Sequence, residues 1–168
     1  MGFTLVELGV ALAISMLLIV GAAAIMRYTV VQTGANNDRT MAQLQTQYVS
    51  FWISQDVMQA QHIHFGNSTG TGFPLTITCG SGTVTYNVVN NPSVSMNPWQ
   101  LTRTEGNATS LVAEYLNPTL TKCYREIEGN QTYNTLVLNV DAKVDQSEAN
   151  STFEISPRYN INSGNIWD

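Results

Sequence analysis

The feature that most constrains this chain is an apolar run near its start. Residues 8–26 contain no Asp, Glu, Lys or Arg. In a helix that rises about 1.5 Å per residue, a run of this length spans the roughly 30 Å hydrocarbon core of a bilayer. Glu7 lies within the apolar stretch that begins at Phe3. A carboxylate at such a depth costs about 2.5–3.5 kcal/mol on insertion scales, so it needs a partner or a functional reason.

A secretory signal peptide and an ordinary single-pass anchor each explain only some of these features. A secretory signal peptide has a shorter apolar core, a basic start and a small-residue cleavage site after the core. Here the three alanines 22–24 are followed by Ile25, Met26 and Arg27. A single-pass anchor explains the length of the run but gives no reason for Glu7. Arg27 flanks the far side and no Lys or Arg flanks the near side, so charge bias alone does not orient the segment.

The residues around Glu7 form a short motif. Residues 2–8 read Gly-Phe-Thr-Leu-Val-Glu-Leu, which resembles the processing and methylation site of type IV pilins, type II secretion pseudopilins and competence pilins. In that family a dedicated peptidase cuts after the Gly, the new N-terminal Phe is methylated, and Glu is the fifth residue of the mature chain. The resemblance implies processing between Gly2 and Phe3, and assembly roles for Phe3 and Glu7. Residues 1–2 are then interpreted as the remainder of a leader, although the family's basic leader is not seen before Gly2.

Composition argues against a partner recognised by charge. The formal net charge is −5, and charged residues make up 11% of the chain. Beyond His64 the basic residues are scattered: Arg103, Lys122, Arg125, Lys143 and Arg158. Phosphate-binding surfaces need clustered Lys and Arg, so we expect no nucleic-acid binding by charge.

The chain has two cysteines, Cys79 and Cys123. In an exported domain an even count favours a disulfide, and two buried free thiols are the alternative. A bridge would close a loop of about 45 residues and contribute roughly 4 kcal/mol in the chain-entropy model. Asn-x-Ser/Thr sequons, which indicate exposed loops and glycosylation where the machinery exists, occur at Asn67, Asn107, Asn130 and Asn150.

The first proline is Pro74, so one helix is predicted from about residue 3 to residue 64. Residues 3–28 are apolar all round, which suits lipid or a filament core. Residues 29–64 are an amphipathic continuation with a broad apolar stripe at helical spacing. We expect this stripe to pack on the rest of the domain; it comprises Met41, Leu44, Tyr48, Val49, Phe51, Trp52, Ile53, Val57 and Ala60.

Residues 65–168 alternate β-type segments with turn residues. The predicted strands are 75–79, 83–89, 99–103, 110–116, 120–126, 135–144 and 151–155. A long helix followed by an antiparallel meander predicts an α+β fold, with the sheet packed on the amphipathic half of the helix. The segments FWISQDVMQAQHI, WQLTR, LVAEYL, TLVLNVDAKV and PRYN are loosely similar to the minor-pilin and J-type pseudopilin branch.

No constellation of catalytic residues is found. His62 and His64, if helical, point about 200° apart and cannot share one ion. The glycine-rich loop 66–72 lacks the Gly-Lys-Ser/Thr ending of a phosphate loop, and the acidic residues have no calcium-loop spacing. We therefore expect no metal, no cofactor and no enzymatic activity.

The resemblance implies a structural subunit that polymerises through its N-terminal helix. Its partners would be copies of itself, the prepilin peptidase and the assembly machinery, and it would move from the inner membrane to an extracellular filament. A major pilin, a minor pilin and a pseudopilin are all compatible with the motif, and a membrane-anchored exported adhesin is the alternative of another class. In a filament we expect the helix to loosen at Gly21, because Gly costs about 0.8–1 kcal/mol relative to Ala in a helix.

Overall fold

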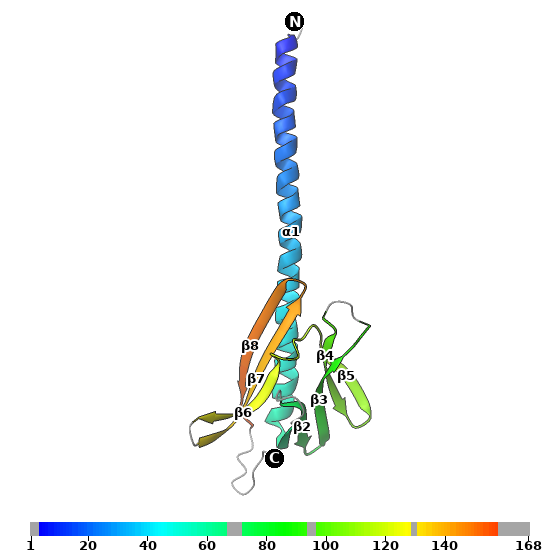
Figure 1. Ribbon diagram of the computed structural model, residues 1–168, viewed down its shortest axis with the longest axis vertical. Coiled ribbons are helices and arrows are strands. Elements are labelled where there is room, and N and C mark those ends of the chain that lie inside the picture. Colours follow the sequence, from blue (N-terminus) through cyan, green and yellow to red (C-terminus); the bar gives the residue numbers. More distant parts are fainter. Residues whose placement is uncertain (1–3, 67–71, 94–96, 129–130, 158–168) are drawn as a thin grey trace. The chain divides into compact units, whose positions relative to one another are not determined.

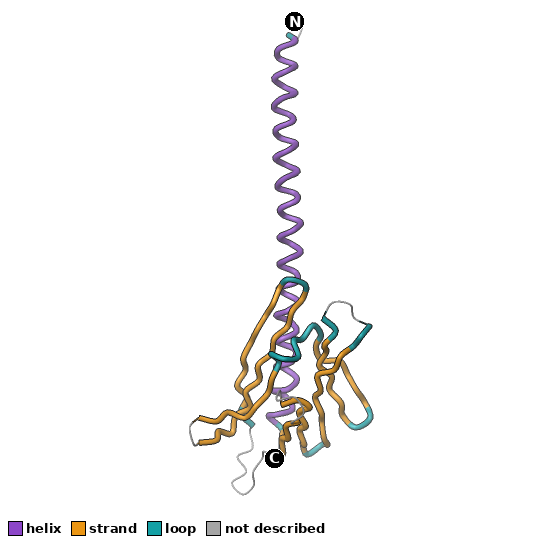
Figure 2. Tube along the Cα trace, in the orientation of Figure 1, coloured by secondary structure: helices purple, strands orange, loops and turns teal. Residues whose placement is uncertain are grey.

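The computed structural model describes residues 4–66, 72–93, 97–128 and 131–157. It confirms the α+β fold: one helix, α1 (Leu5–Met58), is followed along the described chain only by strands (Figure 2). The chain divides into two compact units, residues 1–37 and residues 38–168. α1 belongs to both.

In the first unit every described side chain, from residue 4 to residue 37, is exposed. The hydroxyl groups within it are satisfied by the helix itself. Ser15 Oγ donates to the carbonyl oxygen of Ala11 at 2.8 Å, and Thr29 Oγ1 donates to that of Ile25 at 2.9 Å. By length and composition, α1 is the one described helix that is long and apolar enough to cross a membrane.

The predicted end of the helix at residue 64 is wrong. α1 ends at Met58, and residues Ala60–Gly66 form a strand, β1, which pairs antiparallel with β2 (Gly72–Cys79). Phe65 lies opposite Leu75, and Ile63 opposite Ile77 is fully buried. Pairing with β2 buries Ile63 and gives Phe65 a cross-strand neighbour, so these contacts, and not the local sequence pattern, favour the strand.

The strands form two antiparallel sheets instead of one meander. The first has the order β1-β2-β3-β4-β5, and the second the order β6-β7-β8. All seven predicted segments are strands, with shifted ends: β3 (Gly82–Asn90), β4 (Trp99–Glu105), β5 (Ala108–Ala113), β6 (Lys122–Glu128), β7 (Gln131–Val144) and β8 (Ser147–Ile155), besides β2. Figure 1 shows the two sheets on either side of the second half of α1 in that view.

A single core lies between α1 and the sheets of the second unit. α1 contributes Ala42, Val49, Ile53 and Val57, all fully buried. The largest strand side chains that pack with them are Ile63, Leu75, Ile77, Tyr86, Leu101, Leu136, Leu138 and Val140. On β7, Leu136, Leu138, Val140 and Ala142 face this core, as predicted. The other face of the strand is not left exposed as predicted, because Val137 and Asp141 on that face are also buried.

The two sheets meet where β2 begins. Gly72 has φ = 79°, and a Cβ built there would collide with the carbonyl oxygen of Cys123. Only glycine permits both this conformation and this approach. The contact also fixes Cys123 beside the first residue of β2.

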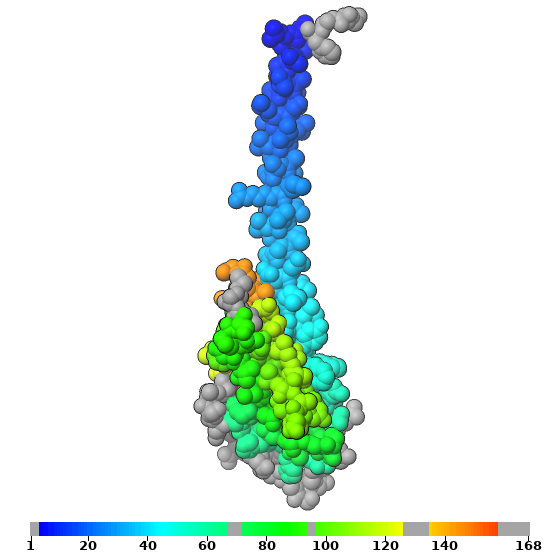
Figure 3. Space-filling model, turned by 90° about the vertical axis from the view of Figure 1, so that its right-hand side faces the viewer, coloured from blue at the N-terminus to red at the C-terminus, as the bar shows by residue number. Residues whose placement is uncertain are grey.

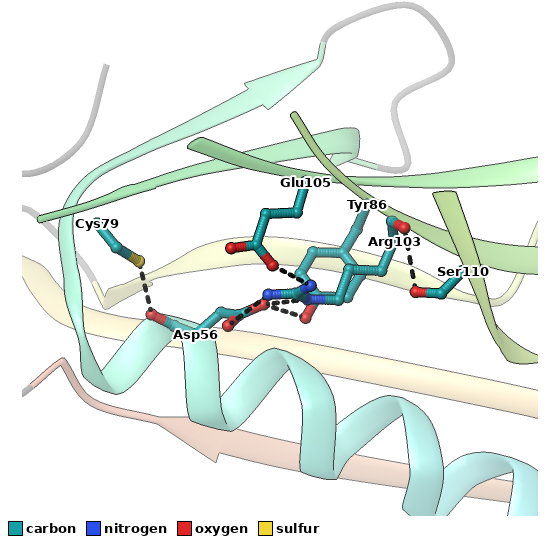
Figure 4. Close-up of polar contacts among 6 residues, drawn as sticks. All are labelled: Asp56, Cys79, Tyr86, Arg103, Glu105 and Ser110. Carbon is teal, nitrogen blue, oxygen red and sulfur yellow. Dashed lines mark hydrogen bonds and ion pairs between the residues drawn. The ribbon is translucent and has the colours of Figure 1, made fainter. Parts of the chain in front are cut away.

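The predicted Cys79–Cys123 disulfide is wrong for this structure, in which both cysteines are free. Cys79 is the last residue of β2, whereas Cys123 lies beside Gly72, its first. Seven residue steps of a strand separate these ends by about 23 Å, far beyond the roughly 7 Å limit for bridged Cα atoms. Burial raises the pKa of both thiols, and Cys79 Sγ donates to the carbonyl oxygen of Asp56 at 3.6 Å (Figure 4).

Candidate functional site

The first candidate site is the start of α1, where Thr4 and Glu7 bond reciprocally. The Thr4 backbone N–H donates to Glu7 Oε2 at 2.8 Å, and Thr4 Oγ1 donates to the same oxygen at 2.9 Å. In return the Glu7 backbone N–H donates to Thr4 Oγ1 at 3.3 Å. This is a capping box, which satisfies amide groups that a helix N-terminus otherwise leaves unpaired.

The capping box gives Glu7 a partner within its own chain. The predicted role of Glu7 did not include it, although a Thr followed three residues later by Glu is its usual signal. The two other residues predicted to act here, Gly2 and Phe3, lie outside the described residues. The structure therefore shows how Glu7 is held and leaves the cleavage position a prediction.

The second candidate site is an exposed apolar stripe on the second half of α1, formed by Met41, Leu44, Tyr48, Phe51 and Trp52. Their exposed fractions range from 37% to 61%. Figure 3 shows this part of the helix, in cyan, at the surface beside the green strands. The prediction that these five side chains form the packed face of the helix is wrong, because none of them is buried.

The buried face of α1 is rotated from the predicted one. It consists of Ala42, Gln45, Thr46, Val49, Ile53, Asp56 and Val57. These positions repeat every three or four residues, so they form one face, and the stripe runs along the adjacent face. Of the predicted set, Val49, Ile53, Val57 and Ala60 are buried as expected. This face carries small, polar and β-branched residues and no aromatic ones.

Part of the stripe is anchored to the sheet. Phe51 and Trp52 contact each other edge to face, with ring centroids 5.9 Å apart. The guanidinium of Arg103 on β4 lies 5.5 Å from the ring of Trp52, a cation–π contact. Trp52 is therefore held in place while its outer side stays exposed.

A buried polar cluster fixes α1 against the five-stranded sheet (Figure 4). Arg103 Nε donates to Asp56 Oδ2 at 2.9 Å, and Tyr86 Oη donates to the same oxygen at 2.5 Å. Arg103 Nη1 reaches Glu105 at 2.7 Å. Burial, followed by the bond to Asp56, raises the pKa of Tyr86, so the phenol remains protonated. The cluster has the character of a structural clamp, and no local sequence pattern indicates it.

Asp141 on β7 is a second buried acid among the residues whose burial the structure describes. Its backbone carbonyl accepts from Thr121 Oγ1 at 3.2 Å, while its Oδ1 atom has no hydrogen-bond partner among the described residues. Asn150 Nδ2, on β8, lies 3.5 Å from Oδ2. Burial, together with the neighbouring carboxylate of Glu148, raises the pKa of Asp141.

The remaining predicted positions are dispersed. Asn107 lies in the exposed turn between β4 and β5, as a glycosylation acceptor would, whereas Asn150 lies within β8 with its amide near Asp141. Asn67 and Asn130 lie outside the described residues. At Gly21 α1 is unbroken, and nothing lies within 4 Å of the position that a Cβ atom would take there. The described residues contain no group of three or more His, Cys, Asp or Glu that could hold a metal ion.

Comparison of the chain with protein-family models, with curated proteins and with solved structures gives no match in any of the three.

Proposed function

We propose that this chain is a type IV pilin-like structural subunit that polymerises through α1. The observation that carries the proposal is the exposed stripe of the second unit. A membrane covers the apolar residues of the first unit, but a monomeric anchored domain leaves Tyr48, Phe51 and Trp52 in water. Contiguous exposed apolar surface of this kind marks an interaction site.

A helical polymer covers both surfaces with copies of the same chain. The first part of α1, apolar from residue 8 to residue 26, suits a water-poor core, and the stripe suits the packing of helices against neighbouring domains. The motif at residues 2–8 supports the same function. It implies a subunit stored in the inner membrane, processed after Gly2 by a prepilin peptidase and then assembled into an extracellular filament.

Glu7 and the amine of Phe3 on a neighbouring copy would form the assembly contact. In a water-poor core an uncompensated charge costs several kcal/mol, so the pairing acts mainly by penalising every register that leaves one charge alone. The capping box occupies Oε2 of Glu7. It leaves the second carboxylate oxygen for the neighbour.

Two related functions share this mechanism. A minor pilin or a J-type pseudopilin would use the same helix contacts at lower abundance, and the loose similarity of the helix end and late strands favours that branch. The alternative of another class, a monomeric membrane-anchored adhesin, predicts that neither Glu7 nor the stripe is needed for surface display.

The stripe can be tested with a matched pair of variants. Phe51 and Leu111 are both apolar and exposed, at 61% and 53%, but Leu111 lies on β5 and not on α1. The full chain would be expressed with the assembly machinery, and sheared surface material examined by negative-stain microscopy. We expect Phe51→Gln to remove most filaments and Leu111→Gln to leave them.

Mass spectrometry of the sheared material adds a second readout. We expect an N-terminus at Phe3 carrying one methyl group. Surface protein with normal display, no ordered polymer and an intact Met1-Gly2 would support the monomeric adhesin instead.

A further inference from the structure

We propose that β1 carries a metal site in which His62 and His64 together chelate one borderline divalent cation, of the Ni²⁺, Cu²⁺ or Zn²⁺ class. The inference is independent of filament assembly. It arises from the corrected end of α1, because the two histidines lie on a strand and not on a helix.

The strand places both imidazoles on one face. His62 lies opposite Thr78, Ile63 opposite Ile77 and His64 opposite Thr76, in unbroken antiparallel register. Ile63 is fully buried in the core, so the residues on either side of it point away from the core. Their Cα atoms are about 6.6 Å apart, two residue steps of a strand. Two histidine side chains at this separation can converge on one ion with metal–nitrogen distances of about 2.0–2.1 Å.

The surroundings leave this face accessible. Both histidines are exposed, and in the part of the chain that the structure describes neither imidazole has a hydrogen bond or an ion pair. The residues opposite them are short threonines that pair with threonines on β3. The Thr78 hydroxyl lies 3.5 Å from that of Thr83, and the Thr76 hydroxyl lies 3.5 Å from that of Thr85. β1 is an edge strand of its sheet, so no further strand flanks the pair on its other side among the described residues.

The ligand type decides the class of ion. Neutral imidazole nitrogen suits Zn²⁺, Cu²⁺ and Ni²⁺, whereas Ca²⁺ and Mg²⁺ require several oxygen ligands. Two protein ligands leave the other positions to water, so the ion is exchangeable and does not hold the fold together. His62 and His64 are the two histidines of this chain. Any binding that depends on imidazole must therefore involve them.

The test uses the full chain in detergent micelles, with Ni²⁺ alone as the probe and isothermal titration calorimetry as the readout. We expect one Ni²⁺ per chain and no binding of Ca²⁺. His62→Ala and His64→Ala should each weaken Ni²⁺ binding at least about tenfold, by similar factors, since each removes one of two ligands.

A spacing control keeps the number of histidines constant. In the double variant His64→Ala/Ala108→His the second histidine moves to β5, four strand spacings or about 19 Å from β1. The proposal expects this variant to bind as weakly as His64→Ala alone. Ni²⁺ binding restored by Ala108→His would overturn the proposed chelate. The affinity would then depend on the number of histidines and not on their spacing.

Two further results would also overturn it. One is a stoichiometry of one Ni²⁺ per two chains, and the other is binding that survives both histidine substitutions but disappears in Cys79→Ser. Carbethoxylation of the unmodified chain gives a measurement without any variant. Ni²⁺ should protect both histidines equally, and protection of one alone would contradict a shared ion.

Discussion

Glu7 bonds to Thr4 of its own chain, and in the proposed filament its second partner is the Phe3 amine of a neighbouring copy. The two roles can be separated because they need different atoms. Glutamine keeps an oxygen that accepts from the Thr4 N–H, so Glu7→Gln preserves the capping box and removes the charge. Thr4→Ala does the reverse: it removes the hydroxyl half of the box and keeps the charge.

If the charge pairing sets filament register, Glu7→Gln should abolish filaments while the subunit stays folded in the membrane. Glu7→Ala should do the same. Thr4→Ala should still assemble, with a helix start weaker by about 0.5–2 kcal/mol. Filament counts and membrane levels of each variant measure these outcomes. Assembly by Glu7→Gln together with failure of Thr4→Ala would assign Glu7 to the cap alone.

Asp141 predicts a pH dependence of stability. Its pKa is raised in the folded protein by burial and by Glu148. The folded state therefore holds a proton more tightly than the unfolded state, and this group favours folding at low pH. The contribution of Asp141 to stability is fully present below the pKa that it has in the unfolded chain, about 4. It is lost as pH rises through the higher pKa of the folded protein.

At neutral pH the buried Asp141 carboxylate is charged and destabilises the folded state. Asp141→Asn should remove this destabilisation, because the amide is neutral and can donate to Glu148. We expect the free energy of unfolding at pH 7 to rise by about 1 kcal/mol. The matched control is Asp145→Asn in the exposed β7–β8 turn, where φ = 50° suits Asn as well as Asp. It should change stability by less than about 0.5 kcal/mol. Urea unfolding at pH 4 and pH 7 distinguishes the two; a destabilised Asp141→Asn at pH 7 would contradict this interpretation of the site.

At the scale of elements, the Asp56 clamp is expected to decide how firmly α1 is held on the five-stranded sheet. Asp56→Ala leaves Arg103 and the Tyr86 hydroxyl without their shared acceptor in a nearly buried position. Removing one partner of a buried pair costs about 3–5 kcal/mol. Glu105→Ala removes the half-exposed arm of the same arginine and should cost less than about 1 kcal/mol. Chemical denaturation of both variants measures the loss of unfolding free energy in each. Equal losses in Asp56→Ala and Glu105→Ala would contradict this prediction.

The elements also show what the sequence could predict and what it could not. The helix, the seven strands and the core-facing residues of β7 follow from local periodicity, which a single sequence displays directly. The burial of Val137 and Asp141 on the other face of β7 does not follow from it. The end of α1 does not, because residues 60–66 become a strand through pairing with β2, a contact outside their local sequence. The face of α1 that is buried likewise depends on which side the sheets approach. The apolar residues lie on two adjacent faces, with the aromatic side chains on one and Val49, Ile53 and Val57 on the other, and this pattern leaves the choice open.

The candidate sites also include features that the sequence can predict and features that it cannot. Glu7 stands out by its position in an apolar run, and its capping box follows from the Thr4–Glu7 spacing. The Asp56–Arg103–Tyr86 cluster joins residues 30 and 47 positions apart, which no spacing rule connects. The disulfide prediction failed for a related reason: an even cysteine count says nothing about which ends of two strands lie together.

At the scale of the whole molecule, the chain carries two kinds of apolar surface that a single copy leaves exposed. Residues 8–26 of α1 are apolar all round, whereas the stripe of the second unit occupies one helix face. Because the two apolar surfaces differ in width, we expect different parts of neighbouring subunits to pack against them in the proposed filament. The first suits a core of surrounding helices, and the second suits a single neighbouring domain.

In the proposed filament, α1 would be surrounded by other subunits, which would allow its backbone to loosen locally. In the single chain α1 is continuous through Gly21. In a filament core, backbone groups freed by loosening can be satisfied by neighbouring subunits or by hydroxyls such as that of Ser15, so a break is tolerated there. Gly21 is the weakest helical position of residues 10–28, and the three small alanines after it add little side-chain packing to hold the turn.

We therefore expect the assembled helix to be extended across residues 21–24, and the filament to lengthen under load. Gly21→Ala should restore about 0.8–1 kcal/mol of helix propensity per subunit and yield a stiffer filament. Gly9→Ala, the same substitution elsewhere in the helix and likewise with nothing within 4 Å of the added Cβ, serves as the control and should not stiffen it. A filament map and force–extension measurements of the three polymers test this. Continuous helical density from Leu8 to Tyr28 in the unmodified filament would end the idea, since no loosened segment would remain for Gly21→Ala to repair.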